Sequence, residues 1–208
     1  MKSAVVFRLV RIVLLLMAPV SLSAQVVPSA TEGRSPFAAG VGVSSFDVDW
    51  EHGRMLGGTL WLDWSPRLGP RLLRGLGLEA EARDISLARS STQPDFRYDT
   101  AGGGPIYRWP LTRTITFYGK YVEAFGSVDF GPAPTPPSGG LQPVGKPYTH
   151  DTRTLVGAGG GLEFRIFRAT RARVDYEYQA WPDLFKNTLD PQGFTAGVEY
   201  DFRFLHRR

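Results

Sequence analysis

The sequence of 208 residues contains no cysteine, and this absence removes several classes of chemistry. Without a thiol the chain has no disulfide, no cysteine nucleophile, no Cys-ligated zinc site and no iron–sulfur cluster. Histidines are also few, at His52, His150 and His206, and no two of them have the spacing of metal ligands. We therefore expect neither a metal site nor a cofactor.

The chain also lacks a strong excess of charge once its N-terminus is set aside. The formal net charge is +4, but Lys2, Arg8 and Arg11 lie within the first eleven residues. Removing them leaves 21 basic residues against 20 acidic ones, a net charge of +1. Such a balance does not favour a polyanion as a ligand, so we expect no nucleic-acid partner.

The N-terminal segment has the three parts of a secretory signal peptide. Positive residues come first, an apolar run follows at 12–20, and small residues precede Gln25. The apolar run is shorter than the ~20 residues of a spanning helix, which disfavours an uncleaved membrane anchor. We predict a signal peptide over 1–24, a short segment over 25–35 and one β-structured domain over 36–208.

Alternation of polar and apolar residues is the main pattern in the rest of the chain. From Arg171 to Ala180 charged or polar residues alternate with apolar ones, which is the period of a β-strand. The segment from Phe194 to Phe204 repeats the pattern with aromatic residues. The predicted strands are Phe37 to Asp47, Met55 to Trp64, Gly75 to Leu87, Phe96 to Tyr107, Arg113 to Val128, Thr152 to Phe167, Thr170 to Trp181 and Phe194 to Phe204.

Two places disturb this alternation, and the connections differ in length. A run of glycines at 102–104 interrupts the fourth strand, and a change of parity around Glu123 predicts a bulge in the fifth. Connections are mostly short after the even-numbered strands. Longer ones follow the odd-numbered strands, including a proline-rich stretch at 131–149, which we interpret as a mobile or extended loop.

An exported all-β chain with one apolar and one charged face has two physical solutions. In a soluble barrel or sandwich the apolar face forms the core, whereas in an outer-membrane barrel it faces lipid. Aromatic residues at strand ends, charges of both signs on the other face, and the need to close every sheet edge in hydrocarbon favour the membrane. The aromatic residues expected at the membrane interfaces are Trp61 or Trp64, Trp109, Tyr176, Tyr178, Trp181, Tyr200 and Phe202.

In the membrane arrangement the charged face lines the lumen and predicts a network of ion pairs. Arginine predominates among the cations, and its planar guanidinium suits confined ion pairs. Lys120 lies on the same face. The predicted network consists of Glu79, Glu81, Arg83, Glu163, Arg165, Arg171, Arg173, Asp175, Glu177, Glu199, Asp201 and Arg203.

The last strand carries a motif that points to a family. Thr195, Gly197, Tyr200 and Phe202 fit the polar-x-Gly-x-x-aromatic-x-aromatic signal of outer-membrane barrels, although four residues, 205–208, follow the final aromatic Phe204. Over nearly its full mature length the chain resembles small OmpA-like and OmpX-like barrels of the Gram-negative envelope. The resemblance implies an eight-stranded antiparallel up-and-down transmembrane β-barrel. It also implies a monomer in outer-membrane lipid, with these residues recognised by the barrel assembly machinery.

The residues offer little chemistry for an enzyme. His150 has Ser127 and either Asp129 or Asp151 as partners for a hydrolytic site, but no spacing matches a nucleophile motif. We therefore predict no catalytic residues. Because eight strands enclose an interior that side chains just fill, a structural or surface-interaction role is favoured. The alternatives are a narrow porin or transporter, an envelope lipid-modifying enzyme and a soluble lipocalin-like binder.

Overall fold

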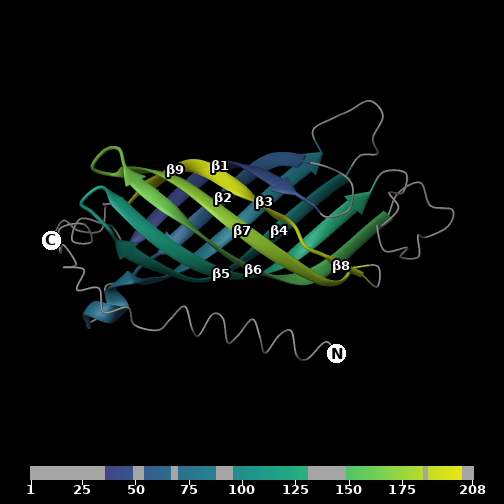
Figure 1. Ribbon diagram of the computed structural model, residues 1–208, viewed down its shortest axis with the longest axis horizontal. Coiled ribbons are helices and arrows are strands. Elements are labelled where there is room, and N and C mark those ends of the chain that lie inside the picture. The colour runs from purple at the N-terminus through teal and green to yellow at the C-terminus, as the bar shows by residue number, and fades with distance from the viewer. Residues whose placement is uncertain are drawn as a thin grey trace.

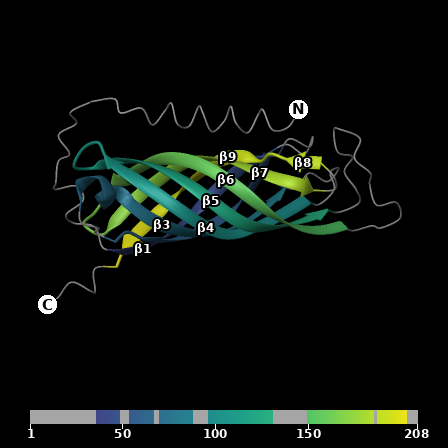
Figure 2. The same cartoon turned by 90° about the horizontal axis from the view of Figure 1, so that it is seen from below.

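The computed structural model describes residues 36–48, 54–66, 70–87, 96–130, 149–184 and 187–202. Its strands run obliquely around a closed cylinder (Figures 1 and 2). A short 3-10 helix, η2 (Arg71–Gly75), lies between the second and third strands. The strands are β1 (Phe37–Asp47), β2 (Arg54–Trp64), β3 (Leu76–Leu87), β4 (Phe96–Pro110), β5 (Ile115–Phe130), β6 (Thr149–Arg165), β7 (Thr170–Leu184), β8 (Asn187–Leu189) and β9 (Gln192–Asp201).

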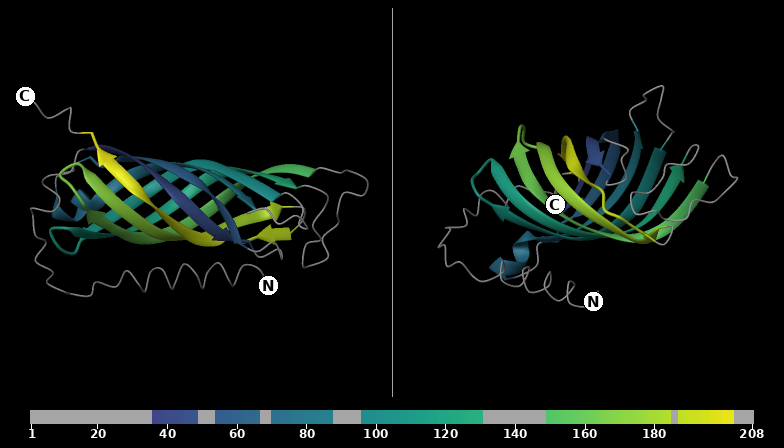
Figure 3. Two further views of the ribbon diagram at one scale, coloured as in Figure 1. Left: turned by 90° about the horizontal axis from the view of Figure 1, so that it is seen from above. Right: turned by 45° about the vertical axis from the view of Figure 1, so that its right-hand side comes forward.

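Antiparallel pairing of sequential neighbours closes the sheet on itself. Each strand from β1 to β7 pairs with the next one along the chain, and β9 pairs with both β7 and β1 (Figure 3). The three-residue β8 pairs with the end of β7, and β9 pairs with the preceding part of β7. Together β8 and β9 therefore occupy the position of the eighth strand of the cylinder. The predicted eight-stranded antiparallel up-and-down barrel is confirmed.

Strand boundaries follow the predicted ones closely, with one clear error inside β5. The register between β4 and β5 is the same on both sides of Glu123, and that between β5 and β6 is continuous, so the predicted bulge is wrong. Glu123 points outward in regular alternation, and the hydroxyl of Tyr121 donates a hydrogen bond to its carboxylate at 3.1 Å. Because Glu123 is a polar residue on the otherwise apolar face, the sequence pattern there looked like a change of parity.

The glycines at 102–104 also lie inside a strand, because β4 continues through them to Pro110. They allow close backbone approach: a Cβ on Gly102 would lie 2.2 Å from the carbonyl oxygen of Glu123. At the other end of the chain, β9 stops at Asp201. Arg203 and Phe204 lie outside the described residues, as do the predicted signal peptide and residues 131–148 of the proline-rich stretch.

The apolar faces of the strands point outward. Val174, Tyr176, Val198 and Tyr200 are 44%, 39%, 48% and 46% exposed, while charged residues that alternate with them are buried. A soluble protein would bury these side chains, so the lipocalin-like alternative is wrong. No helix in the described part of the chain has the length and apolar character to cross a membrane.

One tryptophan expected at the membrane interfaces, Trp181, lies inside the barrel instead, and of the alternatives Trp61 and Trp64 only Trp64 faces outward. Trp61 and Trp181 are 2% and 0% exposed, whereas Trp64 and Trp109 face outward as predicted. Each inner ring occupies space that a glycine leaves open. A Cβ on Gly40 would lie 2.1 Å from the ring of Trp61, and a Cβ on Gly126 would lie 2.0 Å from that of Trp181.

The two ends of the barrel differ in their connections. The turns at 111–114 and 166–169 lie at the same end as η2, the start of β1 and the end of β9 (Figure 1). Outer-membrane barrels have short turns on the periplasmic side and longer loops on the extracellular side. We therefore refer to this end as the periplasmic end and to the opposite one as the extracellular end.

Candidate functional site

The interior of the barrel is the candidate site, and it has two parts of different chemistry. The periplasmic part, here called the ionic half, holds the buried charged side chains of β2 to β7 and β9. The extracellular part, here called the apolar half, is a cluster of Phe46, Val48, Met55, Ile85, Phe96, Tyr98, Val122, Ala124, Val128, Leu155, Trp181, Leu184 and Leu189.

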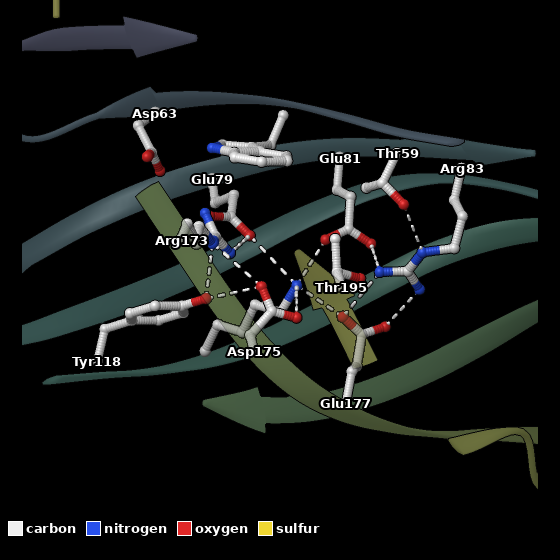
Figure 4. Close-up of polar contacts among 12 residues, drawn as sticks. Thr59, Asp63, Glu79, Glu81, Arg83, Tyr118, Arg173, Asp175, Glu177 and Thr195 are labelled. Atoms are coloured by element: carbon white, nitrogen blue, oxygen red, sulfur yellow. Dashed lines mark hydrogen bonds and ion pairs between the residues drawn. The ribbon is translucent and has the colours of Figure 1, made fainter. Parts of the chain in front are cut away.

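The guanidinium of Arg173 contacts four residues in the ionic half. Its guanidinium makes a two-pronged contact with Glu79, of which the Nη2–Oε1 distance is 3.0 Å, and its Nε lies 3.1 Å from an oxygen of Asp175 (Figure 4). The hydroxyl of Tyr118 accepts a hydrogen bond from the same Nε at 2.6 Å and donates one to Asp175 at 2.7 Å. The guanidinium also lies over the ring of Trp61, 4.8 Å from its centroid.

Lys120 and Arg83 extend the ion pairs towards the middle of the barrel. The Lys120 ammonium lies 2.5 Å from Glu81 and 2.6 Å from Glu177. Arg83 contacts the same two carboxylates, at 2.6 Å and 2.9 Å, and its Nε donates to the hydroxyl of Thr59 at 3.1 Å. These side chains come from four strands, so the contacts tie opposite walls together (Figure 4).

Two further arginines lie nearer the periplasmic end. Arg108 bridges Asp63, at 2.6 Å, and Glu163, at 2.7 Å. Arg171 contacts Asp201 and lies 3.3 Å from Glu199. Each of these guanidinium groups is shared between two carboxylates. Removing one arginine would therefore leave two buried carboxylates without this cationic partner.

Carboxylates outnumber cations among the described buried residues, with eight acidic side chains against five basic ones. Neutral hydrogen-bond donors contact some of the carboxylates in addition to the cations. The indole of Trp61 donates to Glu199 at 3.2 Å, and the amide of Gln179 donates to Glu177 at 2.8 Å. A buried carboxylate is stabilised by such hydrogen bonds as well as by opposite charge.

The structure brings eleven of the twelve predicted network residues to the lumen side of their strands. Arg165 is half-buried, with a buried Nε, while Arg203 lies outside the described residues. The prediction omitted Asp63, Arg108 and Tyr118, and it named no residue of the apolar half as a lumen residue. Asp63 is a charged residue and has the same parity as Trp61 in β2, so it could have identified both as lumen residues.

Aromatic and aliphatic side chains close the apolar half. The ring of Tyr98 packs edge-on against those of Trp181 and Phe46, with centroids 5.8 Å and 6.2 Å apart. Arg83 joins the two halves because its guanidinium lies 4.4 Å from the centroid of Phe46. The buried Tyr98 hydroxyl has no hydrogen-bond partner among the described residues.

The residues considered for hydrolysis lie outside the barrel, at its extracellular end. His150 Nδ1 is 2.5 Å from the Asp129 carboxylate and 3.5 Å from the Ser127 hydroxyl. A serine nucleophile needs the other ring nitrogen when a carboxylate holds Nδ1, so this geometry does not activate Ser127. Thr152 contacts Nε2 at 3.2 Å, and Asp151 accepts a hydrogen bond from the Thr152 amide.

The four residues of the last-strand motif divide between the two faces. Thr195 lies in the lumen, where its hydroxyl is 2.8 Å from that of Ser44, and Gly197 also lies on the lumen side. Tyr200 and Phe202 are exposed on the outer face, with ring centroids 5.6 Å apart. The motif therefore combines two outward rings with two small inward residues.

Comparisons with known proteins agree with this architecture. The family model of the outer membrane protein beta-barrel domain matches residues 12–202. Neisserial surface protein A is similar in structure, with a TM-score of 0.60 and 13% identity over 81% of this chain and 98% of that one. Ail, the attachment invasion locus protein of Yersinia pestis, has a TM-score of 0.54 and 16% identity over 81% and 99%. No curated protein sequence matches the chain.

Proposed function

Because the chain belongs to the outer membrane β-barrel protein family, we propose that it is a non-conducting barrel whose closed interior supports its extracellular loops in a structural or surface-interaction role. Its place is the outer membrane, as predicted from the last-strand motif and the alternation. The same resemblance supports a monomer that the barrel assembly machinery inserts through Thr195, Gly197, Tyr200 and Phe202.

The filling of the lumen carries this proposal. Trp61, Trp181, Arg173, Tyr98 and Tyr118 all point into the cylinder, and none has more than 2% of its surface exposed. Ion pairs close the periplasmic half, and packed rings close the extracellular half. A porin needs a continuous water path, whereas this interior favours a rigid support.

A conductance measurement tests the proposal. We expect the full mature chain in a planar bilayer to show no stepwise conductance. A double variant, Phe96→Ala with Trp181→Ala, removes two large side chains from the apolar half only and should also show no steps, because the ion pairs still close the periplasmic half. Heat-modifiable gel mobility serves as the control that both proteins are folded barrels. Steps of porin size from the unchanged chain would overturn the proposal and favour the transporter alternative.

The enzyme alternative has a separate test. If the barrel modified envelope lipids through His150, the variant His150→Ala would abolish that activity while keeping the heat-modifiable gel mobility of a folded barrel. We expect identical lipid profiles after incubation of the unchanged chain and of the variant with outer-membrane vesicles. A product formed only by the unchanged chain would contradict the non-enzymatic role.

A further inference from the structure

The periplasmic connections carry arginine and no acidic residue. Arg74 lies in the last turn of η2, Arg113 lies in the turn between β4 and β5, and Arg168 lies in the turn between β6 and β7. All three side chains are exposed, and none forms an ion pair with another described residue. The connection at 65–75 and both tight turns contain no Asp or Glu. Because the three connections alternate around the cylinder, they form a cationic rim.

The extracellular end shows no such excess. Arg97 is paired with Asp84 and Asp99, at 2.9 Å and 3.3 Å, and Arg153 is paired with Asp151 at 3.1 Å. Arg54, the third described arginine of that end, forms no ion pair with another described residue, but Asp47 is its cross-strand partner in the β1–β2 register. The unpaired positive charge of the described outer surface is concentrated at the periplasmic end.

Exposed apolar side chains accompany the arginines of the rim. Leu73 precedes Arg74, Leu111 begins the turn that holds Arg113, and Phe167, 70% exposed, precedes Arg168. An apolar residue next to an unpaired arginine at a membrane border matches a lipid, which has an apolar chain below an anionic headgroup. A soluble anion would contact the arginine but would have no apolar part to contact the neighbouring apolar side chain.

A cleft on the outer wall adds an independent observation. It has a volume of about 570 Å³ and lies at the periplasmic end of β1 to β3. Leu78, in its wall, follows Arg74 by four residues, and Trp64 lines it from β2. Other outward side chains around it are Phe37, Leu62, Ala80 and Phe202. An apolar cleft of this kind fits an acyl chain, and Arg74, in the connection that leads into β3 at the same end of the barrel, fits a phosphate.

We propose that the rim of Arg74, Arg113 and Arg168 binds anionic glycerophospholipids of the inner leaflet. The guanidinium groups hold the headgroup phosphates, and the cleft at the same end of the barrel holds an acyl chain. The lipid is chosen by its net negative charge, because a zwitterionic headgroup offers its own cation to the phosphate. This inference does not depend on whether the lumen conducts.

Native mass spectrometry of the full mature chain, released from detergent with an equal mixture of phosphatidylglycerol and phosphatidylcholine, tests the proposal. Each arginine near a headgroup contributes about fivefold in affinity, so we expect the unchanged chain to retain phosphatidylglycerol at least about fivefold more than phosphatidylcholine. The triple variant Arg74→Gln, Arg113→Gln, Arg168→Gln should retain both lipids equally. The matched control Arg54→Gln, Arg97→Gln, Arg153→Gln removes the same charge from the extracellular end and should keep the preference.

Three results would overturn the proposal. They are equal retention of the two lipids by the unchanged chain, a preference that survives in the rim variant, and an equal loss in both triple variants. Displacement of phosphatidylglycerol by millimolar inorganic phosphate would also contradict it, since the site would then bind a free anion. Both triple variants must keep heat-modifiable mobility, which shows that a loss reflects the rim and not the fold.

Brominated phosphatidylglycerol tests the cleft separately. Bromine on the acyl chain quenches a tryptophan that it contacts, so quenching should be weaker in the variant Trp64→Phe than in the unchanged chain. The variant Trp109→Phe, which removes an outward tryptophan outside the cleft, provides the comparison. Equal quenching in the two variants would show that no acyl chain is held in the cleft.

Discussion

The ionic and apolar halves of the interior close the same cylinder by opposite means. In the ionic half, four of the five buried cations, Arg83, Arg108, Lys120 and Arg173, are each shared between carboxylates of different strands. In the apolar half, rings such as those of Tyr98 and Trp181 pack without any charge. The outer wall is apolar beside both halves. The comparison shows that the lumen face of this small barrel combines two chemistries, whereas the outer face stays largely apolar beside both.

The two halves should respond differently to substitution. A buried ion pair gains little over an apolar pair of the same shape, but the removal of one partner leaves an uncompensated charge. In a packed cluster the loss depends instead on the volume removed. The ionic half is therefore sensitive to small chemical changes that the apolar half tolerates.

The largest effect is expected from Arg173→Met in the ionic half. Methionine keeps part of the volume but leaves Glu79 and Asp175 without their guanidinium, which should lower the free energy of unfolding by about 3 to 5 kcal/mol. Urea unfolding of the refolded barrel in detergent micelles, followed by tryptophan fluorescence, measures the change. The exposed Arg97→Met should change it by less than about 1 kcal/mol, and equal effects would contradict the assigned burial.

A smaller effect is expected when the same charge is placed on the outer wall. Val198 points to lipid from β9, between the outward residues Ala196 and Tyr200. Val198→Arg should lower the free energy of unfolding in lipid bilayers by about 2 to 4 kcal/mol, because a guanidinium in hydrocarbon lacks water and carboxylates. Correct insertion at unchanged stability would contradict the facing of β9.

The fold could be predicted because alternation and connections are local features of the sequence. Phe37–Asp47 was predicted with the bounds that β1 has, and the parity of β7 separates lumen from lipid residues as far as Trp181, after which the strand is irregular. The prediction failed at Glu123, where the hydrogen bond from Tyr121 accommodates a carboxylate on the outer face. No local pattern distinguishes such a residue from a bulge.

The site could be predicted for the ionic half only. Trp181 has the parity of the charged residues of β7, yet its aromatic ring suggested a place at the membrane interface. The apolar half has no polar contrast, because side chains such as Val128 and Leu155 resemble those of the outer wall. Partners such as Gly126 and Trp181 come from strands that are not adjacent, and only the closed barrel brings them together.

Replacing a tyrosine by phenylalanine removes a single hydroxyl, and this change can be made in both the ionic and the apolar half. The first test is Tyr118 in the ionic half. This hydroxyl donates to Asp175 and accepts from Arg173, and both partners are charged. Tyr118→Phe should therefore lower the free energy of unfolding by about 1.5 to 3 kcal/mol in the urea experiment. A change of less than 0.5 kcal/mol, roughly the scatter of such surface substitutions, would mean that the hydroxyl is dispensable in the ionic half.

Tyr98 gives the corresponding test in the apolar half, and the smallest expected effect. Its hydroxyl is buried among Phe46, Trp181 and their neighbours, with no hydrogen-bond partner among the described residues. Tyr98→Phe keeps the ring contacts and removes a polar group that has lost its water, so the free energy of unfolding should stay unchanged or rise by up to about 1 kcal/mol. A loss as large as that of Tyr118→Phe would reveal polar contacts in the apolar half and would remove the distinction between the two.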